Sequence, residues 1–248
     1  MALIDIHAEG EVTHMVLNRP SQLNALSPAL LECLIDQCDI VARSDAKIVV
    51  LSGAGEAFSA GADLKAFAEK LMGPQSLQSA DLGRLAANAV AAIPQLKIAW
   101  IDGVCIGGGL VLASACDLRW STPESRFSLP ELAIGFPVGW GGTARVAEII
   151  GLPQTKALTI ESTPITAQRA QEIGLISQIF VDLDSYQTSL DRVAGIPRFS
   201  LMQTLKQFQN IHAGTFVAEN DAQLLVDAFK KPEVLEKLMT AWQNKSSK

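Results

Sequence analysis

Short apolar runs alternate with amphipathic stretches through the first half of the chain. Residues 3–7 and 12–18 have the pattern of two strands separated by a short turn, which predicts a hairpin. From Pro28 to about Arg43 the apolar residues recur at helical spacing, and Ser27 is a suitable N-cap for this helix. A continuous apolar run at 47–52 then predicts a buried strand.

The same order of strands and helices repeats further along the chain. We expect helices at 63–70 and 77–93, a buried strand at 98–101, a helix that begins within 107–109, and strands at 118–121 and 127–129. Strands that are apolar throughout and alternate with helices predict an α/β fold in which helices cover an open sheet. From about Pro197 strand signals vanish and helical periodicity takes over. We therefore predict an α/β core at 1–196 and a C-terminal helical region at 197–248.

The bulk composition narrows the classes of partner. A chain of 248 residues with 48% apolar side chains can bury the core of a single domain. The formal net charge is −6 and no run of Lys or Arg could neutralise phosphates, so a nucleic-acid partner is not expected. Apolar stretches end before the roughly 20 residues of a membrane helix. With no signal-peptide pattern and no CxxC spacing among its cysteines, we expect a soluble protein of the reducing cytoplasm.

Two loops rich in small residues could hold a ligand against the backbone. The segment 58–64, Phe-Ser-Ala-Gly-Ala-Asp-Leu, lies between a predicted strand and a helix for which Asp63 is a suitable N-cap, although a tight turn would explain it equally well. The triplet Gly107-Gly108-Gly109 leads directly into an apolar helix. Glycine destabilises a helix, so three at its start require a reason. Free N–H groups over Gly108 would suit an oxyanion.

Several other chemistries do not fit the sequence. The glycine spacing is neither that of a dinucleotide-binding motif nor that of a P-loop, and Ala57 breaks a possible GxSxG around Ser59. The histidines, His7, His14 and His212, fall in two early strands and a late helix, which favours neither a catalytic triad nor a metal site. We therefore expect no bound metal.

Glu131 stands alone among apolar neighbours after Pro130. A carboxylate at the first turn of a helix explains it as well as a catalytic role does.

Taken together, four ordered motifs resemble the crotonase (enoyl-CoA hydratase/isomerase) superfamily. They are Asn-Arg-Pro with Asn-Ala-Leu within 18–26, the loop at 58–64, the glycine triplet after Ile-Asp-Gly, and the stretch from Cys116 to Val146. The resemblance implies a crotonase-like (ββα)n spiral with a C-terminal helical region, an acyl-CoA substrate, and no tightly bound cofactor beyond the coenzyme A of that substrate. It also implies an oxyanion hole formed by the N–H groups of Ala60 and Gly108. Losing one such donor typically costs roughly 100-fold to 1,000-fold in rate.

The resemblance further implies where coenzyme A is bound. The expected contacts are Ser21, Gln22, Leu23, Ala60, Gly61, Ala62, Asp63, Leu64 and Gly108. Many relatives carry a basic residue at the position of Ser21, so Lys65 and Lys245 are candidate replacements for contacts with the phosphates. Relatives also form homotrimers, often paired as dimers of trimers, with the C-terminal helices at the subunit contact.

The choice of reaction depends on one departure from the family pattern. Hydratases of the superfamily use two glutamates, and here Val111 occupies the first position and Glu131 the second. Valine cannot position water, whereas a single base suffices to move a proton between two carbons of a 3-enoyl thioester. Gly139 stands where another group of isomerases has an acid. The pattern therefore most resembles Δ3,Δ2-enoyl-CoA isomerases of fatty acid metabolism, with Glu131 as general base.

An apolar pocket would raise the pKa of this base, whereas a helix start would oppose the shift. The expected pocket residues are Leu129, Leu132, Ile134 and Trp140. Three alternatives stay open: an enoyl-CoA hydratase in which another group replaces the missing carboxylate, a decarboxylase or C–C lyase that uses the same oxyanion hole, and a non-catalytic CoA-thioester binding protein.

Overall fold

Two β-sheets form the centre of the protein. The computed structural model describes residues 2–246, without the side chains of 69 and 244–246. The larger sheet contains, in spatial order, β1 (Ile4–Glu9), β2 (Val12–Leu17), β3 (Ile48–Gly53), β5 (Leu96–Ile101), β7 (Leu118–Ser121) and β10 (Gln178–Ile179). The smaller sheet contains β4 (Ala57–Ser59), β6 (Val104–Ile106), β8 (Arg126–Ser128) and β9 (Ile165–Thr166). The chain thus divides its strands between two sheets, where the sequence predicted a single open one.

The division follows a repeat. In three successive strand pairs, the first strand (β3, β5, β7) joins the larger sheet and the second (β4, β6, β8) joins the smaller one. Within each sheet these strands are parallel, while β1 and β2 form the predicted antiparallel hairpin, with Ile4 opposite Leu17. This arrangement confirms the (ββα)n spiral.

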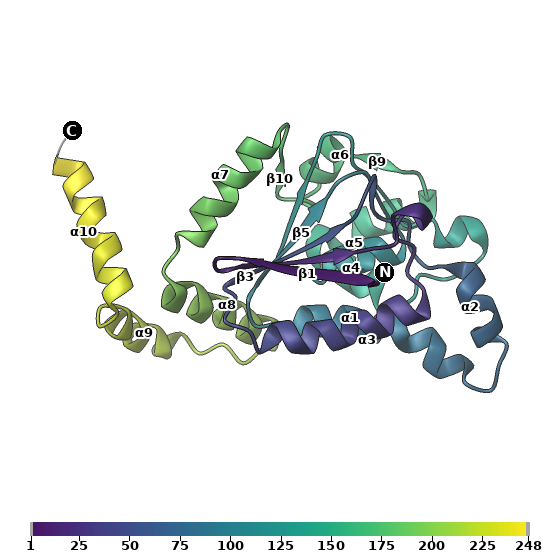
Figure 1. Ribbon diagram of the computed structural model, residues 1–248, viewed down its shortest axis with the longest axis horizontal. Coiled ribbons are helices and arrows are strands. Elements are labelled where there is room, and N and C mark those ends of the chain that lie inside the picture. Colours follow the sequence, from purple (N-terminus) through teal and green to yellow (C-terminus); the bar gives the residue numbers. More distant parts are fainter. Residues whose placement is uncertain (1, 247–248) are drawn as a thin grey trace.

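Helices surround the sheets (Figure 1). They are α1 (Pro28–Ala42), α2 (Leu64–Leu71), α3 (Ser76–Ala92), α4 (Gly108–Ser114), α5 (Gly142–Glu161), α6 (Ala167–Glu172), α7 (Leu183–Ala194), α8 (Arg198–His212), α9 (Asp221–Ala228) and α10 (Pro232–Ser246), with short 3-10 turns η1 (Pro20–Gln22), η2 (Glu131–Ile134) and η3 (Ala218–Asn220). The first four helices lie close to their predicted ranges. Helix α5 was not predicted, and it is interrupted at Gly151 (φ 74), just before Pro153.

Both faces of the larger sheet are covered at β3, which explains the continuous apolar run in this strand. On β3, Val49 and Leu51 pack into a cluster with α1, α3 and α4, whereas Ile48 and Val50 pack into a second cluster that includes α7 and α8. Helices α1 and α3 run side by side over the first face (Figure 1).

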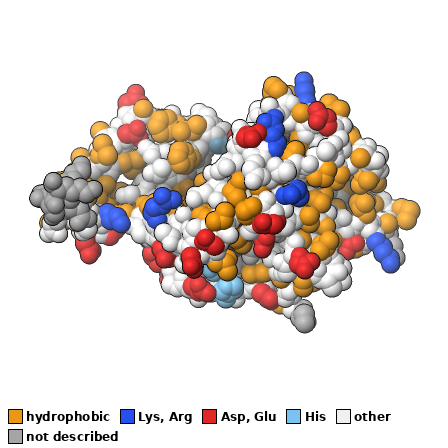
Figure 2. Space-filling view, turned by 90° about the horizontal axis from the view of Figure 1, so that it is seen from above, with side chains coloured by type: hydrophobic (Ala, Val, Ile, Leu, Met, Phe, Trp, Pro, Cys, Tyr) orange, Lys and Arg blue, Asp and Glu red, His pale blue; other side chains and the backbone are white. Residues whose placement is uncertain are grey.

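The C-terminal helices extend away from the sheets. Helices α9 and α10 lie at one end of the molecule (Figure 1), and α8 contributes Leu205 to the second core cluster. Large apolar side chains on this part are exposed: Phe208, Ile211, Phe216, Val217, Leu225, Val226, Phe229, Leu235, Met239 and Trp242. In Figure 2, hydrophobic side chains are spread among charged ones over both the core and the C-terminal side. Within residues 2–246, no helix is both long and apolar enough to cross a bilayer.

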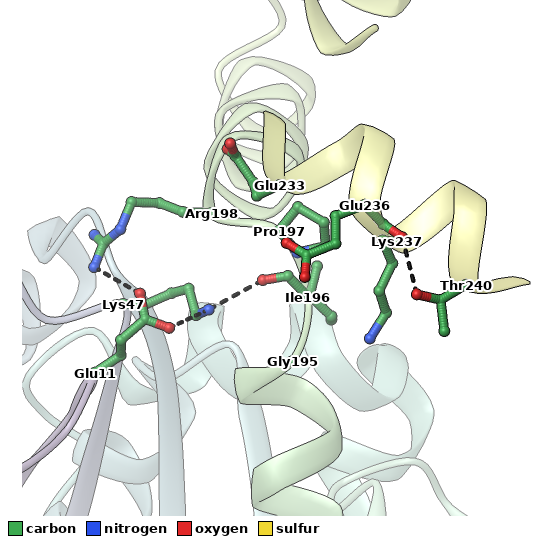
Figure 3. A pocket seen from close by; sticks show the side chains of 10 residues that line it. All are labelled: Glu11, Lys47, Gly195, Ile196, Pro197, Arg198, Glu233, Glu236, Lys237 and Thr240. Atoms are coloured by element: carbon green, nitrogen blue, oxygen red, sulfur yellow. Dashed lines mark hydrogen bonds and ion pairs between the residues drawn. The ribbon is translucent and has the colours of Figure 1, made fainter. Parts of the chain in front are cut away.

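A polar hollow of about 620 Å³ lies where the C-terminal helices leave the core (Figure 3). Three of its charged groups, Glu11, Lys47 and Arg198, are paired with one another. The buried ammonium of Lys47 forms an ion pair with Glu11 and donates to Ile196 O at 3.1 Å, and Arg198 contacts the same carboxylate at 3.3 Å. The hydrogen bond from Lys47 holds the pKa of Glu11 below its ordinary value. These contacts describe an ionic junction that attaches α8 to the core rather than a reaction centre.

Candidate active site

A second cavity, of about 420 Å³, lies where the loop after β4 meets the start of α4. Its wall consists of Ala60, Gly61, Ala62, Leu64, Phe67, Ala68, Leu71, Ala80, Ile106, Gly107, Gly108, Val111, Pro130, Glu131, Ile134, Phe136, Pro137, Gly139 and Trp140. Among the described side chains in this wall, that of Glu131 is the one that can ionise. The cavity therefore joins both glycine-rich loops and the isolated carboxylate of the sequence analysis.

Backbone hydrogen bonds from residues near the N-terminus hold the loop after β4. The N–H of Ala60 donates to Leu23 O at 2.9 Å, so this amide is already engaged. Leu26 donates to Gly61 O at 2.8 Å and accepts from Asp63 N–H at 3.1 Å. Leu26 and Ala62 thus form an isolated parallel β-bridge, in which Leu26 makes both hydrogen bonds, one to each neighbour of Ala62. The N–H of Ala62 therefore points away from Leu26.

Polar side chains of the Asn-Arg-Pro motif brace the same loop. Asn24, in a left-handed conformation (φ 53), accepts from Arg19 N–H at 2.9 Å and donates to Ala54 O and Ala57 O. Arg19 also forms an ion pair with Asp63 at 3.0 Å. The Asp63 side chain caps α2, as predicted, and its hydrogen bond from Ala66 N–H lowers its pKa, with a further contribution from Arg19. This motif therefore positions the loop.

Each glycine of the triplet has its own steric reason. An ideal Cβ on Gly107 would lie 2.9 Å from Glu131 Oε1, and one on Gly109 would lie 2.8 Å from the Cβ of Ser59. A Cβ on Gly108 would overlap the indole of Trp140. Gly107 also has φ 52, which favours glycine. The triplet thus lets a carboxylate, an indole and β4 approach the same backbone.

The N–H of Gly108 opens the first turn of α4, where amides have no intrahelical partner. Gly61 lies directly against it, because an ideal Cβ on Gly61 would be 3.4 Å from Gly108 N. The two loops expected to hold an oxyanion are therefore adjacent.

Glu131 is half-buried on the cavity wall, and its Oε2 has no hydrogen-bond partner. Desolvation by burial raises the pKa of this carboxyl, opposed by a hydrogen bond from its own backbone. Of the apolar neighbours predicted for it, Ile134 and Trp140 do line the cavity, whereas Leu129 lies in the core and Leu132 is exposed outside the wall. Such a carboxyl is suited to accept a proton.

Val111 is 1% exposed and lines the cavity. It packs against Gly142, where an added Cβ would lie 2.6 Å from Val111 Cγ2. The position where hydratases of the superfamily carry a glutamate is here apolar and closely packed.

The residues expected to contact coenzyme A divide into two groups. Ser21, Gln22 and Leu23 are exposed beside the loop after β4, which they reach through the hydrogen bond to Leu23 O. Leu64 and Lys65 are exposed at the start of α2. The Lys245 side chain lies outside the described residues.

A group of three possible metal ligands, His7, Glu9 and His14, lies on the β1–β2 hairpin, where the ligand atoms are within 4.8 Å of one another. The two imidazoles stack with centroids 4.7 Å apart and an interplanar angle of 4°. Nitrogen lone pairs lie in the ring plane, so in two parallel stacked rings they do not converge on one ion. This arrangement does not favour a metal centre.

Comparison with known proteins agrees with the fold. The family model for enoyl-CoA hydratase/isomerase matches residues 7–244. The crystal structure of an enoyl-CoA hydratase from Bacillus anthracis superposes with a TM-score of 0.85 at 29% identity, covering 98% of this chain and 97% of that one. This chain belongs to the enoyl-CoA hydratase/isomerase family.

Curated relatives carry the names of different reactions. The chain is 33% identical to the short-chain-enoyl-CoA hydratase of Clostridium acetobutylicum over 70% of this chain and 67% of that protein. It is 33% identical to the mitochondrial Delta(3,5)-Delta(2,4)-dienoyl-CoA isomerase of mouse, over 72% of this chain and 58% of that protein. It is 35% identical to the peroxisomal fatty acid beta-oxidation multifunctional protein of rice, of which it spans 24%. Family membership alone therefore leaves the reaction open.

Proposed function

We propose that this protein is a Δ3,Δ2-enoyl-CoA isomerase in which Glu131 is the general base. The observation that carries the proposal is that Glu131 supplies the ionisable group among the described side chains of the cavity wall. Hydration requires a water molecule to be held and split, for which relatives use a second carboxylate, whereas Val111 offers only methyl groups. Moving a proton requires one base. Coenzyme A enters as part of the substrate, so no tightly bound cofactor is needed.

The thioester oxygen would be held by backbone amides. The N–H of Gly108 is the first donor, as the sequence suggested. For the second, the hydrogen bonds favour Ala62 over the expected Ala60, because Ala60 N–H is used by Leu23 O while Ala62 N–H points away from Leu26. Ala60 then contributes to the cavity wall. Two amide donors stabilise the negative charge that develops on this oxygen during enolisation.

The proton transfer follows from this arrangement. Glu131 removes a proton from C2 of the 3-enoyl thioester, and the electron pair moves through the carbon chain onto the thioester oxygen as a dienolate. The same carboxyl then returns the proton to C4, the double bond moves to C2–C3, and no proton is gained or lost overall. A raised pKa makes Glu131 a stronger base, and the apolar wall around it limits the access of competing water.

We also propose, from the family resemblance, that the acyl-CoA is gripped by Ser21, Gln22 and Leu23 together with the backbone of 60–64 and Gly108. The same resemblance suggests a homotrimer or dimer of trimers, with 197–248 at the subunit contact. The cytoplasmic location is proposed from the cysteine spacing. The exposed apolar side chains of α8, α9 and α10 support this role for the C-terminal helices. Sedimentation velocity of the full chain tests the oligomeric state.

The reaction is tested by incubating the protein with 3-enoyl-CoA and with 2-enoyl-CoA in deuterated water and following products by mass spectrometry. We expect conversion of the 3-enoyl to the 2-enoyl thioester without hydroxyacyl-CoA. Rapid formation of hydroxyacyl-CoA would refute the isomerase and favour a hydratase. Release of CO₂ from a malonyl-type thioester would identify a decarboxylase.

The role of Glu131 is tested by Glu131→Gln, which keeps the shape and removes the base. We expect turnover to fall by roughly 100-fold to 10,000-fold, the usual contribution of a general base, with acyl-CoA affinity retained. Glu124→Gln, an exposed glutamate on the turn before β8, is the matched control and should behave as wild type. Unchanged turnover in Glu131→Gln would remove this residue from the mechanism.

A further inference from the structure

Trp140 fills the space between α3 and the start of α4. Its indole Nε1–H donates to Ala80 O on α3 at 3.0 Å, and its ring centroid lies 6.0 Å from that of Phe67 on α2. Its backbone has φ 58, a conformation uncommon for a bulky side chain. The segment after η2 thus adopts an unfavourable backbone angle where it directs a large ring inward.

Two glycines on different helices make room for this ring. An ideal Cβ on Gly83, which is buried within α3, would overlap indole atoms Cδ2, Cε2 and Cε3. An ideal Cβ on Gly108, the first residue of α4, would overlap atoms Cζ3, Cε3 and Cη2 of the same indole. Glycine within a helix destabilises it relative to alanine, so Gly83 is explained by the indole that it accommodates.

The indole therefore forms part of the wall of the active-site cavity, next to Gly108. The proposed oxyanion donor, Gly108 N–H, places the thioester carbonyl beside the ring, and Glu131 places C2 and C4 nearby. Coenzyme A is expected on the side of Leu23 and Leu64, so carbons beyond C4 would extend away from it, toward Trp140. The space that they would need between α3 and α4 is occupied by the ring.

We infer that Trp140 restricts the substrate to short acyl groups. The inference rests on the proposed function for the direction of the acyl chain, but it concerns binding and does not require turnover. In this arrangement Trp140 limits the length of the bound acyl chain, whereas Glu131 reacts with it.

The test is equilibrium binding of saturated butanoyl-, hexanoyl-, octanoyl- and decanoyl-CoA by titration calorimetry, with the wild type, Trp140→Ala and Trp140→Leu. We expect wild-type affinity to stop rising after the short members of the series. In Trp140→Ala it should continue to rise by up to about fourfold per methylene, the usual gain for burying one CH₂. Butanoyl-CoA should bind all variants similarly, which shows that the site is intact.

Ile40→Ala removes an exposed apolar side chain of α1, outside the cavity, and should keep the wild-type profile. The inference is overturned if wild type binds decanoyl-CoA with the same gain per methylene as the variant, or if neither Trp140 variant changes the profile. Trp140→Leu keeps the test decisive if the alanine variant does not fold. A changed profile in a protein that fails to isomerise 3-enoyl-CoA would refute the proposed reaction and leave the role of Trp140 standing.

Discussion

Replacing Gly83 with alanine tests the packing of the active-site wall directly. In an exposed helix this change is stabilising by about 0.5–1 kcal/mol, because alanine restricts the unfolded chain more than glycine does. In this protein the new methyl group would overlap the indole of Trp140. The ring is also held in place from elsewhere, because Gly108 lies against it and Ala80 O accepts from its Nε1–H.

The energetic cost of this overlap can be compared with the gain in helix propensity. Overpacking a well-filled site costs about 1–3 kcal/mol, and losing the indole hydrogen bond costs about 0.5–1.5 kcal/mol more. After subtracting the gain in helix propensity, Gly83→Ala should lower the free energy of unfolding by about 2 kcal/mol. For a chain of this size that corresponds to a fall in Tm of roughly 4–8 °C.

The assay is urea unfolding followed by circular dichroism, in a double-mutant cycle with Trp140→Ala. In the Trp140→Ala background the indole is absent, so Gly83→Ala should change sign and stabilise by about 0.5–1 kcal/mol. Gly139→Ala, where an added Cβ meets nothing within 4 Å, is a control expected to change stability by less than about 0.5 kcal/mol. If Gly83→Ala stabilises the wild type and the Trp140→Ala protein equally, the indole does not pack against Gly83.

The remaining predictions concern three ionisable groups, Glu131, Asp63 and Lys47. Burial raises the pKa of Glu131, so kcat/KM should rise with pH through a midpoint above the ordinary 4.5 in a stopped-flow pH profile. The same raised pKa makes Glu131 favour folding below pH 4.5 and lose that contribution as pH rises, so Glu131→Gln should be the more stable protein in urea at pH 7. Asp63→Ala should cost about 1 kcal/mol at pH 7 by loss of the helix cap, and this difference from wild type should shrink as acid protonates the low-pKa carboxyl. Lys47→Met should destabilise by roughly 1–3 kcal/mol and speed hydrogen exchange in α8, because Ile196 O and the Glu11 carboxylate lose the ammonium that joins them. Unchanged exchange would show that the junction does not attach this helix.

The predictions from sequence that were confirmed depend on residues that are close together along the chain. The alternation of residues in β1 and β2 shows a hairpin, and Ser27 and Asp63 are recognised as caps because the amides they bond lie three residues on. The glycine triplet signals a close approach, since only a steric demand outweighs its cost to a helix. The prediction of a single sheet failed because it concerned how strands pair, which short-range patterns do not encode.

Long-range contacts decided the details of the candidate site. Which amide is free for an oxyanion depends on hydrogen bonds made by Leu23 and Leu26, more than thirty residues before the loop. Helix α5 escaped prediction because Gly151 and Pro153 break its periodicity, and packing nonetheless continues it. The unpaired oxygen of Glu131 and the overlap of Trp140 with Gly83 exist only once the helices are packed. Sequence by itself determined which residues could react, and the tertiary structure decided which of their groups are left unpaired and how much space surrounds them, because both depend on distances between segments remote in the chain.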